Sequence, residues 1–552
     1  MDRRQALLER ARTKGVNPLL YWLIRAVLQP FCHVYFQMSR IGREHLPPEG
    51  PMIIAANHRS FLDPFVIAML ARRPVYFVAK RELFANRFVA WLLSSLGAFP
   101  IDRGAGDADA MATARAILER GDGILMFPEG TRVRLGGLGS PRRGVGRLAL
   151  ETGAPVVPVA VFGTQDVRRG WRLRPHKVRL RAGRPLRFPK VEHPSPALAM
   201  AVTERIWPCV ELQWEWLGGL APLRRAAVIG AGSWGTALAV ALARAGVDVE
   251  LGTRTAEQRD ALEAARRNNG YLPGVALPDG LRVRHADELD LAHADLVCLA
   301  VPARALPAVV AAHGERVRPQ AALLVATRGL VPPAGALPSA YLAERIPARA
   351  IAVLGGAAQA ADAVAHGAAL VVAAADRDLT AQLRDVLGRA GFDVEATSDV
   401  VGLELAGAAA NTAVLAAAAA SVAGPNAAGA AAGRVLAEVA AYAGRRGARA
   451  ETFAGLAGAG GVIATTAAES SRDRRAGELL GRGVPADRIG PALGHPVEAL
   501  GALPLLARAL HDEGVRAPTV SGLAAVVEGR APAETWARSV TAPTGPRARR
   551  AA

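Results

Sequence analysis

The stretch AAVIGAGSWGTALA, residues 226–239, decides the fold of the second half of this chain. A short apolar run leads into Gly-x-Gly-x-x-Gly and then into an alanine-rich segment, which is the order of a strand, a tight turn and a helix. Gly230 permits the tight turn, Gly232 lets the backbone approach a pyrophosphate, and Gly235 lets the helix pack on the strand. The pattern predicts a dinucleotide-binding Rossmann unit that starts past residue 220.

The composition bounds the class of protein. A chain of 552 residues is too long for one ordinary core, so two to four domains are expected. With 51% hydrophobic and 21% charged residues the chain is globular and not disordered. The three cysteines, Cys32, Cys209 and Cys298, show neither metal-ligand spacing nor a disulfide framework, which fits a reducing cytosol.

The net charge of +18 is concentrated in the first half. Residues 1–220 hold 33 Lys+Arg against 18 Asp+Glu, or +15, which leaves 34 against 31, or +3, for the rest. The densest run, residues 167–190, has ten Lys or Arg and no acid. Such clusters attract anionic lipid headgroups or nucleic acid, and a solvated arginine-rich surface is the alternative. Nucleic acid is not expected, because no helix-turn-helix, zinc or aromatic-rich recognition motif accompanies the charge.

An apolar segment precedes this basic region at residues 16–36. Pro18, Arg25 and Pro30 interrupt it, so it lacks the roughly 20 consecutive apolar residues of a membrane span. No small-residue cleavage site follows, which argues against a secretory signal. We expect an interfacial helix pair in the headgroup region, and a core helix of the first domain is the alternative. Its aromatic anchors would be Tyr21, Trp22 and Tyr35.

The stretch MIIAANHRSFLDPFVI, residues 52–67, places a histidine and an aspartate after a β-type apolar run. Four residues separate His58 from Asp63, so on a turn that enters a helix the two side chains can face each other. The carboxylate would then accept the imidazole Nδ1–H and leave Nε2 as a base for a hydroxyl. Such a pair also arises by chance, so a catalytic role needs support from other segments of the chain.

Three later apolar runs also end in polar residues or turns. GAFPIDRG, residues 97–104, ends at Asp102-Arg103, and GILMFPEGTRV, residues 123–133, runs into a loop with a guanidinium and a hydroxyl. GAPVVPVAVFG, residues 153–163, is a further strand. The order of strands, polar strand ends and intervening helical stretches predicts an α/β domain whose chemistry gathers at the strand ends.

Residues from about 35 to 190 resemble the glycerolipid acyltransferase family, specifically the 1-acyl-glycerol-3-phosphate acyltransferases. The four blocks NHRSFLD, GAFPIDR, FPEGTR and VVPV occur here in the family's order. The resemblance implies that His58 removes a proton from a glycerol hydroxyl while Asp63 orients the ring. The hydroxyl would then attack the thioester of acyl-CoA or acyl carrier protein, and no metal is needed.

The same resemblance implies how an acceptor is bound. An arginine would grip the phosphate of a lysophosphatidate-type acceptor. The implied binding residues are Asn57, Arg103, Glu129, Gly130, Thr131 and Arg132. Because that acceptor is an anionic lipid, we expect a peripheral or monotopic enzyme at the cytoplasmic face of a membrane, in phospholipid synthesis. Each Lys or Arg near an anionic surface adds on the order of 1 kcal/mol to adsorption.

Residues from about 226 to 538 resemble NAD(P)-dependent glycerol-3-phosphate dehydrogenases. The resemblance rests on GSWGTALA, RRNNGYLPG, ADLVCLAVPA, ATRGL, GPNAA and SSRDRRAGELLGRG, in that order. The second strand ends in GTRT, where Arg254 is available to a 2′-phosphate, so NADP is favoured over NAD. A glycine turn without cofactor is the alternative. The implied cofactor contacts are Gly230, Gly232, Ser233, Trp234, Gly235, Arg254, Ala360 and Arg472.

The sequence departs from the dehydrogenase pattern at the residues that would carry its chemistry. Where the family has a lysine in a Thr-Lys-Gly segment, this chain has Arg328, and where the family has a lysine before an asparagine, it has Ala410 before Asn411. The family's Gly-Asp-Leu segment reads Gly460-Gly461-Val462 here. Residues 221–552 contain no lysine at all. Arginine stays charged and alanine has no titratable group, so we expect efficient hydride transfer to be lost. Two alternatives stay open: a bifunctional enzyme that reduces dihydroxyacetone phosphate, and a membrane-bound NADP-responsive regulatory protein.

Together these features predict an α/β protein in several parts. A membrane-interfacial segment (1–38) and an α/β acyltransferase domain (39–215) precede a doubly wound Rossmann domain (226–400). An all-α substrate domain (401–538) and a disordered tail (539–552) complete the chain.

Overall fold

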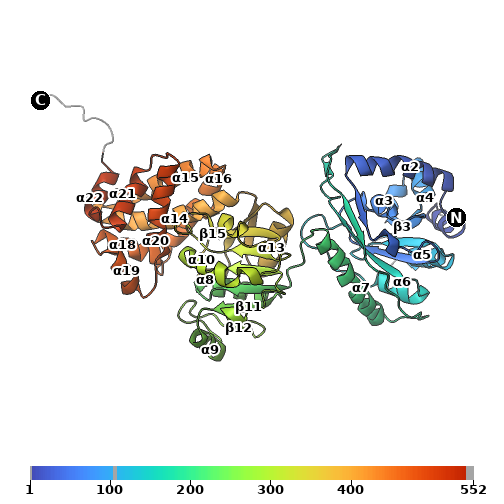
Figure 1. Cartoon of the computed structure of the whole chain (residues 1–552), viewed down its shortest axis with the longest axis horizontal. Helices are drawn as coiled ribbons and strands as arrows, with labels where there is room; N and C mark the ends of the chain where they lie inside the picture. The colour runs from blue at the N-terminus through green and yellow to red at the C-terminus, as the bar shows by residue number, and fades with distance from the viewer. Residues whose placement is uncertain (1–2, 103–107, 543–552) are drawn as a thin grey trace, which may run out of the picture. The chain divides into compact units, whose positions relative to one another are not determined.

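The computed structural model describes residues 3–102 and 108–542 and divides into two compact units. Unit 1 spans residues 1–221 and unit 2 spans residues 222–552. Both are α/β, and the junction lies within five residues of the predicted Rossmann start (Figure 1). The predicted fold class is confirmed.

Unit 1 contains a seven-stranded sheet in the order β1-β9-β6-β2-β5-β3-β4. Every neighbouring pair is parallel except β6 and β9, which are antiparallel. A parallel sheet needs cover on both faces, and β2 is buried along its whole length. The strands are β1 (Ser39–Ile41), β2 (Met52–Ala56), β3 (Val75–Lys80), β4 (Ala98–Ile101), β5 (Gly123–Met126), β6 (Val156–Phe162) and β9 (Arg179–Ala182).

Helices cover both faces of this sheet, because successive side chains of β2 point alternately into two different cores. Met52 and Ile54 belong to the core beneath α2, α3 and α4, whereas Ile53 and Ala55 belong to the core beneath α1, α5, α6 and α7. Figure 1 shows α2, α3 and α4 on one side of the sheet and α6 and α7 on the other. The helices are α1 (Arg3–Thr13), α2 (Pro18–Tyr35), α3 (Asp63–Ala68), α4 (Arg87–Ser95), α5 (Ala108–Glu119), α6 (Gly144–Thr152) and α7 (Pro196–Trp216).

The amino-terminal segment is part of unit 1 and not a separate piece. Leu8 of α1 and Cys32 of α2 lie in the two cores. The predicted helix pair within residues 16–36 is wrong, because α2 is one helix that continues through Pro30. A proline costs one backbone hydrogen bond there without ending the helix. Tyr21 is buried and therefore does not lie on the outer face where we expected an anchor.

Unit 2 opens with an eight-stranded sheet in the order β12-β11-β10-β13-β14-β15-β16-β17, parallel except between β15 and β16. The strands are β10 (Arg225–Ile229), β11 (Asp248–Thr253), β12 (Arg282–His285), β13 (Leu296–Leu299), β14 (Ala322–Val325), β15 (Ala350–Ala357), β16 (Ala369–Ala374) and β17 (Asp393–Thr397). The helices of this half are α8 (Ser233–Arg244), α9 (Ala256–Ala265), α10 (Leu306–His313), α11 (Pro338–Ala343), α12 (Ala360–His366) and α13 (Arg377–Arg389). This is the doubly wound arrangement that the glycine turn predicts.

The rest of unit 2 is helical and packs around α14 (Val400–Ala420). The segment Val400–Ala423 is the one candidate membrane span among the described residues, but most of its apolar window is buried inside the unit, as in a core helix. The other helices are α15 (Pro425–Arg445), α16 (Ala450–Ala454), α17 (Gly461–Ala467), α18 (Arg472–Gly481), α19 (Ala486–Leu493), α20 (Glu498–Asp512), α21 (Pro518–Val527) and α22 (Ala533–Val540). Because α22 reaches Val540, the tail predicted from 539 starts too early, and residues 543–552 lie outside the described part.

Candidate functional site

The predicted histidine–aspartate pair forms at the carboxyl end of β2. The His58 Nδ1–H donates to Asp63 Oδ2 over 2.8 Å. The His58 side chain is 11% exposed, whereas that of Asp63 is fully buried at the start of α3. The hydrogen bond fixes the imidazole tautomer and leaves Nε2 without the proton, ready to accept one.

Asp63 is held by a set of donors that the sequence did not reveal. The backbone N–H groups of Arg59 and Ser60 donate to Oδ2 over 2.6 and 2.7 Å. The Thr164 hydroxyl donates to Oδ1 over 2.6 Å. Because these donors hold both oxygens, the carboxylate has a fixed position from which it orients the ring of His58. Thr164 lies just after β6, and its position at a strand end was the only signal for it.

Glu129 joins the loop of residues 128–133 to the histidine. Its Oε2 accepts the backbone N–H of His58 over 2.6 Å, and its Oε1 accepts that of Gly139 over 2.7 Å. Burial raises the pKa of Glu129 to about 7, against the two backbone donors, which lower it. Both oxygens are therefore occupied by the protein backbone, which fits a positioning role for Glu129.

The loop that contains Arg132 lies directly beside His58. The Val133 N–H donates to the His58 carbonyl over 2.8 Å, in a loop where Gly130 has a positive φ of 68°. Thr131 is exposed and Arg132 is half-buried, so both remain accessible to a ligand. Arg103 lies outside the described residues.

Asn57 has a different environment from these loop residues. It is fully buried, and its amide exchanges two hydrogen bonds with the backbone of Val161 on β6, over 3.0 and 2.8 Å. This pairing fastens the end of β2 to β6. The contacts favour positioning of the His58 loop over direct contact with an acceptor.

Two further side chains support the site and were not expected from the sequence. The Phe127 ring stacks on the His58 imidazole with centroids 4.0 Å apart. The Arg59 guanidinium is buried over the Trp214 ring at 4.5 Å and donates to the Gly136 carbonyl over 2.7 Å. Arg59 thereby holds the loop after Arg132 against the end of α7.

In unit 2 each of the three glycines of the dinucleotide turn is required, or tolerated, for a different structural reason. Gly230 has a φ of 109°, and a Cβ on Gly235 would lie 1.8 Å from the Gly230 carbonyl oxygen. A Cβ on Gly232, by contrast, would meet no protein atom within 4 Å. The open space above Gly232, at the amino-terminal end of α8, fits the pyrophosphate of a dinucleotide.

The other predicted cofactor contacts are only partly brought together. Arg472, from α18, donates to Ser233 Oγ over 3.0 Å and so lies over the turn. Trp234 is half-buried, Arg254 is exposed after β11, and Ala360 is buried at the start of α12. The guanidinium of Arg472 adds a positive charge to the amino-terminal end of α8, where an anion would bind.

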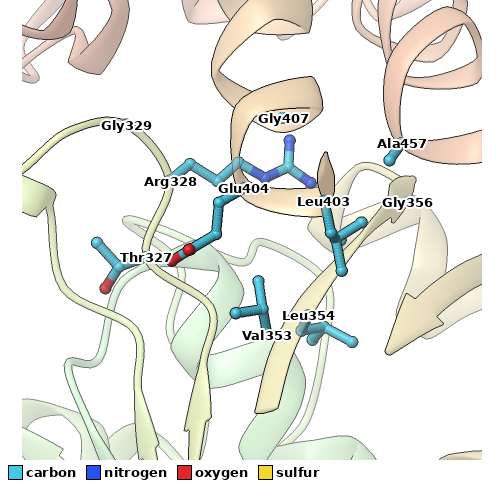
Figure 2. Close-up of a pocket in the computed structure, with 11 residues that line it drawn as sticks. Thr327, Arg328, Gly329, Val353, Leu354, Gly356, Leu403, Glu404, Gly407 and Ala457 are labelled. Atoms are coloured by element: carbon cyan, nitrogen blue, oxygen red, sulfur yellow. The ribbon is translucent and has the colours of Figure 1, made fainter. Parts of the chain in front are cut away.

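The residues that replace the dehydrogenase lysines lie between the Rossmann and helical parts of unit 2. Figure 2 shows the Arg328 side chain running beneath α14 near Gly407, beside Glu404. The cavity that they line measures about 10 Å³, room for one water molecule, so it does not by itself define a substrate site. Ala410 faces Gly461, on which a Cβ would lie 3.3 Å from the Ala410 Cβ.

Buried acids accompany Arg328. Burial lowers the pKa of Arg328, whereas the charges of Glu498 and Asp473 raise it. Burial raises the pKa of Asp473 to about 6 and that of Glu498 to about 7. A guanidinium is a poor substitute for the amine of lysine as a proton donor or acceptor, so Arg328 does not replace the chemistry of the family lysine.

Comparison with known proteins assigns both units. Residues 38–162 match the family model described as acyltransferase. Residues 225–381 and 399–538 match the models of the N-terminus and C-terminus of NAD-dependent glycerol-3-phosphate dehydrogenase.

Individual relatives agree with the assignment of unit 2. The NAD(P)+ glycerol-3-phosphate dehydrogenase of Methylococcus capsulatus is 37% identical over 321 residues, which are 56% of this chain and 93% of that protein. The corresponding enzyme of Thermus thermophilus is 38% identical over 304 residues, 54% of this chain and 92% of that protein. The crystal structure of glycerol-3-phosphate dehydrogenase from Coxiella burnetii has a TM-score of 0.55 at 26% identity and covers 57% of this chain and 98% of that one. The chain therefore belongs to the NAD-dependent glycerol-3-phosphate dehydrogenase family through residues 225–538, and it carries an acyltransferase domain at residues 38–162.

Proposed function

We propose that unit 1 transfers a fatty acyl group from acyl-CoA or acyl carrier protein to a lysophosphatidate-type acceptor in phospholipid synthesis. The observation that carries this proposal is the 2.8 Å hydrogen bond from His58 to the buried Asp63, next to the loop of Arg132. That arrangement supplies a base for a hydroxyl and a cationic side chain for a phosphate at one sheet edge.

The proposed reaction uses His58 twice. Its Nε2 takes the proton of the acceptor hydroxyl while the hydroxyl oxygen attacks the thioester carbonyl. An ester bond forms, the carbon–sulfur bond breaks, and the imidazolium returns its proton to the leaving thiolate. Asp63 stabilises the transient imidazolium and keeps Nε2 aimed at the acceptor. Gly130, Thr131 and Arg132 would bind the acceptor phosphate.

The test compares His58→Ala with His193→Ala, an exposed histidine of the same unit. Acyl transfer is measured with lysophosphatidate, glycerol 3-phosphate and lysophosphatidylcholine, with each donor, and with and without NADPH. We expect His58→Ala to lower the rate by about 10²–10⁴-fold and the control to change little. Equal rates in both variants would remove His58 as the base.

For unit 2 we propose that the nucleotide site is retained and that hydride transfer is impaired. Support comes from the open space above Gly232, from Arg328 and Ala410 at the two lysine positions, and from the absence of lysine in residues 221–552. The identity of 37% to a dehydrogenase over most of its length favours a second candidate, a bifunctional enzyme that also reduces dihydroxyacetone phosphate. Measuring NADPH oxidation with dihydroxyacetone phosphate distinguishes the two candidates, since rapid turnover would refute the proposal that hydride transfer is impaired.

We further propose that the protein works at the cytoplasmic face of a membrane as a peripheral or monotopic enzyme. Support comes from the net charge of +15 on residues 1–220 and from the exposed apolar side chains of α2. A membrane-bound NADP-responsive regulator without transferase activity is disfavoured by the assembled His58–Asp63 pair.

A further inference from the structure

A small basic hairpin projects from unit 1 between β6 and β9. It consists of β7 (Arg168–Arg169) and β8 (Arg172–Leu173), which pair antiparallel around Gly170 and Trp171. The Trp171 side chain is 80% exposed, and the Arg172 guanidinium lies over its ring at 5.0 Å. All ten residues from 168 to 177 are exposed, and Arg168, Arg169, Arg172 and Arg174 are among them.

The hairpin is nevertheless anchored in the fold. Its base is closed by the Arg174 N–H, which donates to the Val167 carbonyl over 2.8 Å, and the Val167 side chain is fully buried. Its far strand is tied to α2, because the Tyr35 hydroxyl donates to the Leu173 carbonyl over 3.1 Å. The hairpin therefore has a fixed place beside the end of α2.

The outer face of α2 is apolar. Leu19, Leu23 and Val27 follow each other at a spacing of four residues, and they are 85%, 64% and 64% exposed. The same helix also exposes Trp22, Phe31 and Val34. Contiguous apolar side chains of this size on a helix mark a site of interaction and not ordinary surface.

The hairpin also reaches the catalytic loop. The Arg168 guanidinium lies 5.7 Å from the centroid of the Phe61 ring. Phe61 is 41% exposed and belongs to the turn between His58 and Asp63. The contacts thus run from α2 through the hairpin to the turn that carries the base.

We propose that the hairpin and the outer face of α2 form one docking surface for an anionic phospholipid bilayer. Trp171 would sit at the level of the headgroups, the four hairpin arginines would contact lipid phosphates, and the apolar face of α2 would enter the acyl boundary. An indole flanked by guanidinium groups suits that boundary, which is apolar on one side and anionic on the other. The inference deepens the proposed function and rests on it, because the acceptor would then reach His58 past Phe61 directly from the bilayer.

The first experiment measures binding of the full chain to vesicles of phosphatidylcholine with phosphatidylglycerol, by co-sedimentation. Trp171→Ala is compared with Trp216→Ala, since Trp216 is 66% exposed on α7 and likewise lies under a guanidinium, that of Arg181, at 4.5 Å. We expect Trp171→Ala to weaken binding by about tenfold and Trp216→Ala to leave it near wild type. Equal binding of the two variants would overturn the proposal.

The charge is tested with Arg169→Glu against Arg205→Glu, an exposed arginine on α7. We expect Arg169→Glu to weaken binding to the anionic vesicles more than the control does, and the difference to vanish on pure phosphatidylcholine or in high salt. A difference that persists on neutral vesicles would contradict the role assigned to charge. Circular dichroism shows whether each variant is folded.

The last arm separates failure of this inference from failure of the proposed function. The ratio of acyl transfer to a vesicle-embedded acceptor over a soluble short-chain acceptor is measured, and we expect Trp171→Ala to lower it and Trp216→Ala not to. If wild type shows no transfer at all while Trp171→Ala still loses vesicle binding, docking stands and the proposed function falls. If Trp171→Ala changes only the KM for acyl carrier protein, the hairpin belongs to the donor and the docking inference falls.

Discussion

The Thr164 hydroxyl donates to Asp63 Oδ1 over 2.6 Å, across 101 residues of sequence. The other oxygen of the same carboxylate accepts from His58 and from two backbone N–H groups. The end of β6 therefore helps to aim a base that sits at the end of β2. This link makes the geometry of the base depend on the sheet order as well as on the local turn.

Asp63→Asn is expected to disable the base while largely preserving its shape. The amide would present N–H groups to donors that need an acceptor, so both the imidazole tautomer and its orientation would be lost. We expect acyl transfer to fall by about 10²–10⁴-fold, measured with saturating donor and acceptor. A variant that keeps more than half of the wild-type rate would contradict the orienting role.

Thr164→Val isolates the contribution of β6 to the same carboxylate. Valine keeps the shape of threonine but leaves Asp63 Oδ1 without its donor, which costs about 1–3 kcal/mol in the free energy of unfolding. The transfer rate should fall less than in Asp63→Asn, because the His58 hydrogen bond remains. A larger loss of rate in Thr164→Val than in Asp63→Asn would show that Thr164 has a direct role.

The glycines of the dinucleotide turn should separate into a structural and a functional one. Gly235→Ala forces a Cβ to within 1.8 Å of the Gly230 carbonyl and should lower the melting temperature of unit 2. Gly232→Ala meets no protein atom and should leave the melting temperature unchanged while it weakens NADPH binding, measured by titration calorimetry. Unaltered NADPH affinity in Gly232→Ala would place the nucleotide elsewhere or exclude it.

A lysine restored at position 410 should support hydride transfer only when an acidic residue is introduced beside it. Ala410→Lys alone introduces a buried charge without a partner. Gly461→Asp supplies a carboxylate for it, since a Cβ on residue 461 would lie 3.3 Å from the Cβ of residue 410. We expect the double variant to oxidise NADPH with dihydroxyacetone phosphate faster than either single variant, and faster than wild type by up to about 10²–10⁴-fold. Wild-type turnover that already matches ordinary dehydrogenases would refute the premise.

Glu404 should make the stability of unit 2 depend on pH. Burial raises the pKa of Glu404 to about 7, against two hydrogen bonds from Ser339 that lower it. Between pH 4.5 and 7 the folded state keeps this proton and the unfolded state loses it, so the free energy of unfolding falls as pH rises, by about 3 kcal/mol in all.

Glu404→Gln removes this titration and preserves the contacts with Ser339. Its unfolding free energy at pH 8 relative to pH 5 should therefore decline less than that of wild type, measured by urea denaturation. Glu395→Gln, an exposed residue of β17, is the matched control. Parallel curves for Glu404→Gln and wild type would show that Glu404 does not titrate in this range.

Several features could be predicted because they are local. The backbone conformation of the glycine turn at 230–235 follows from its own glycines. The spacing of His58 and Asp63 allows their hydrogen bond because only one turn separates the histidine from the start of the next helix. The continuous apolar runs that form β2, β5 and β6 predicted strands buried on both faces. In each case the interacting groups lie within a few residues of one another.

The sequence by itself determined the two families, the order of their parts and the base with its carboxylate, since these depend on local spacing. Only the tertiary structure decided that Thr164 completes the support of Asp63, that Asn57 and Glu129 bind backbone, and that Arg472 lies over Ser233, 239 residues away. It also turned a proline-interrupted segment into one helix with a buried Tyr21. The physical reason is that burial and long-range hydrogen bonds depend on which strand ends and helix faces the fold brings together, and spacing along the chain does not encode that.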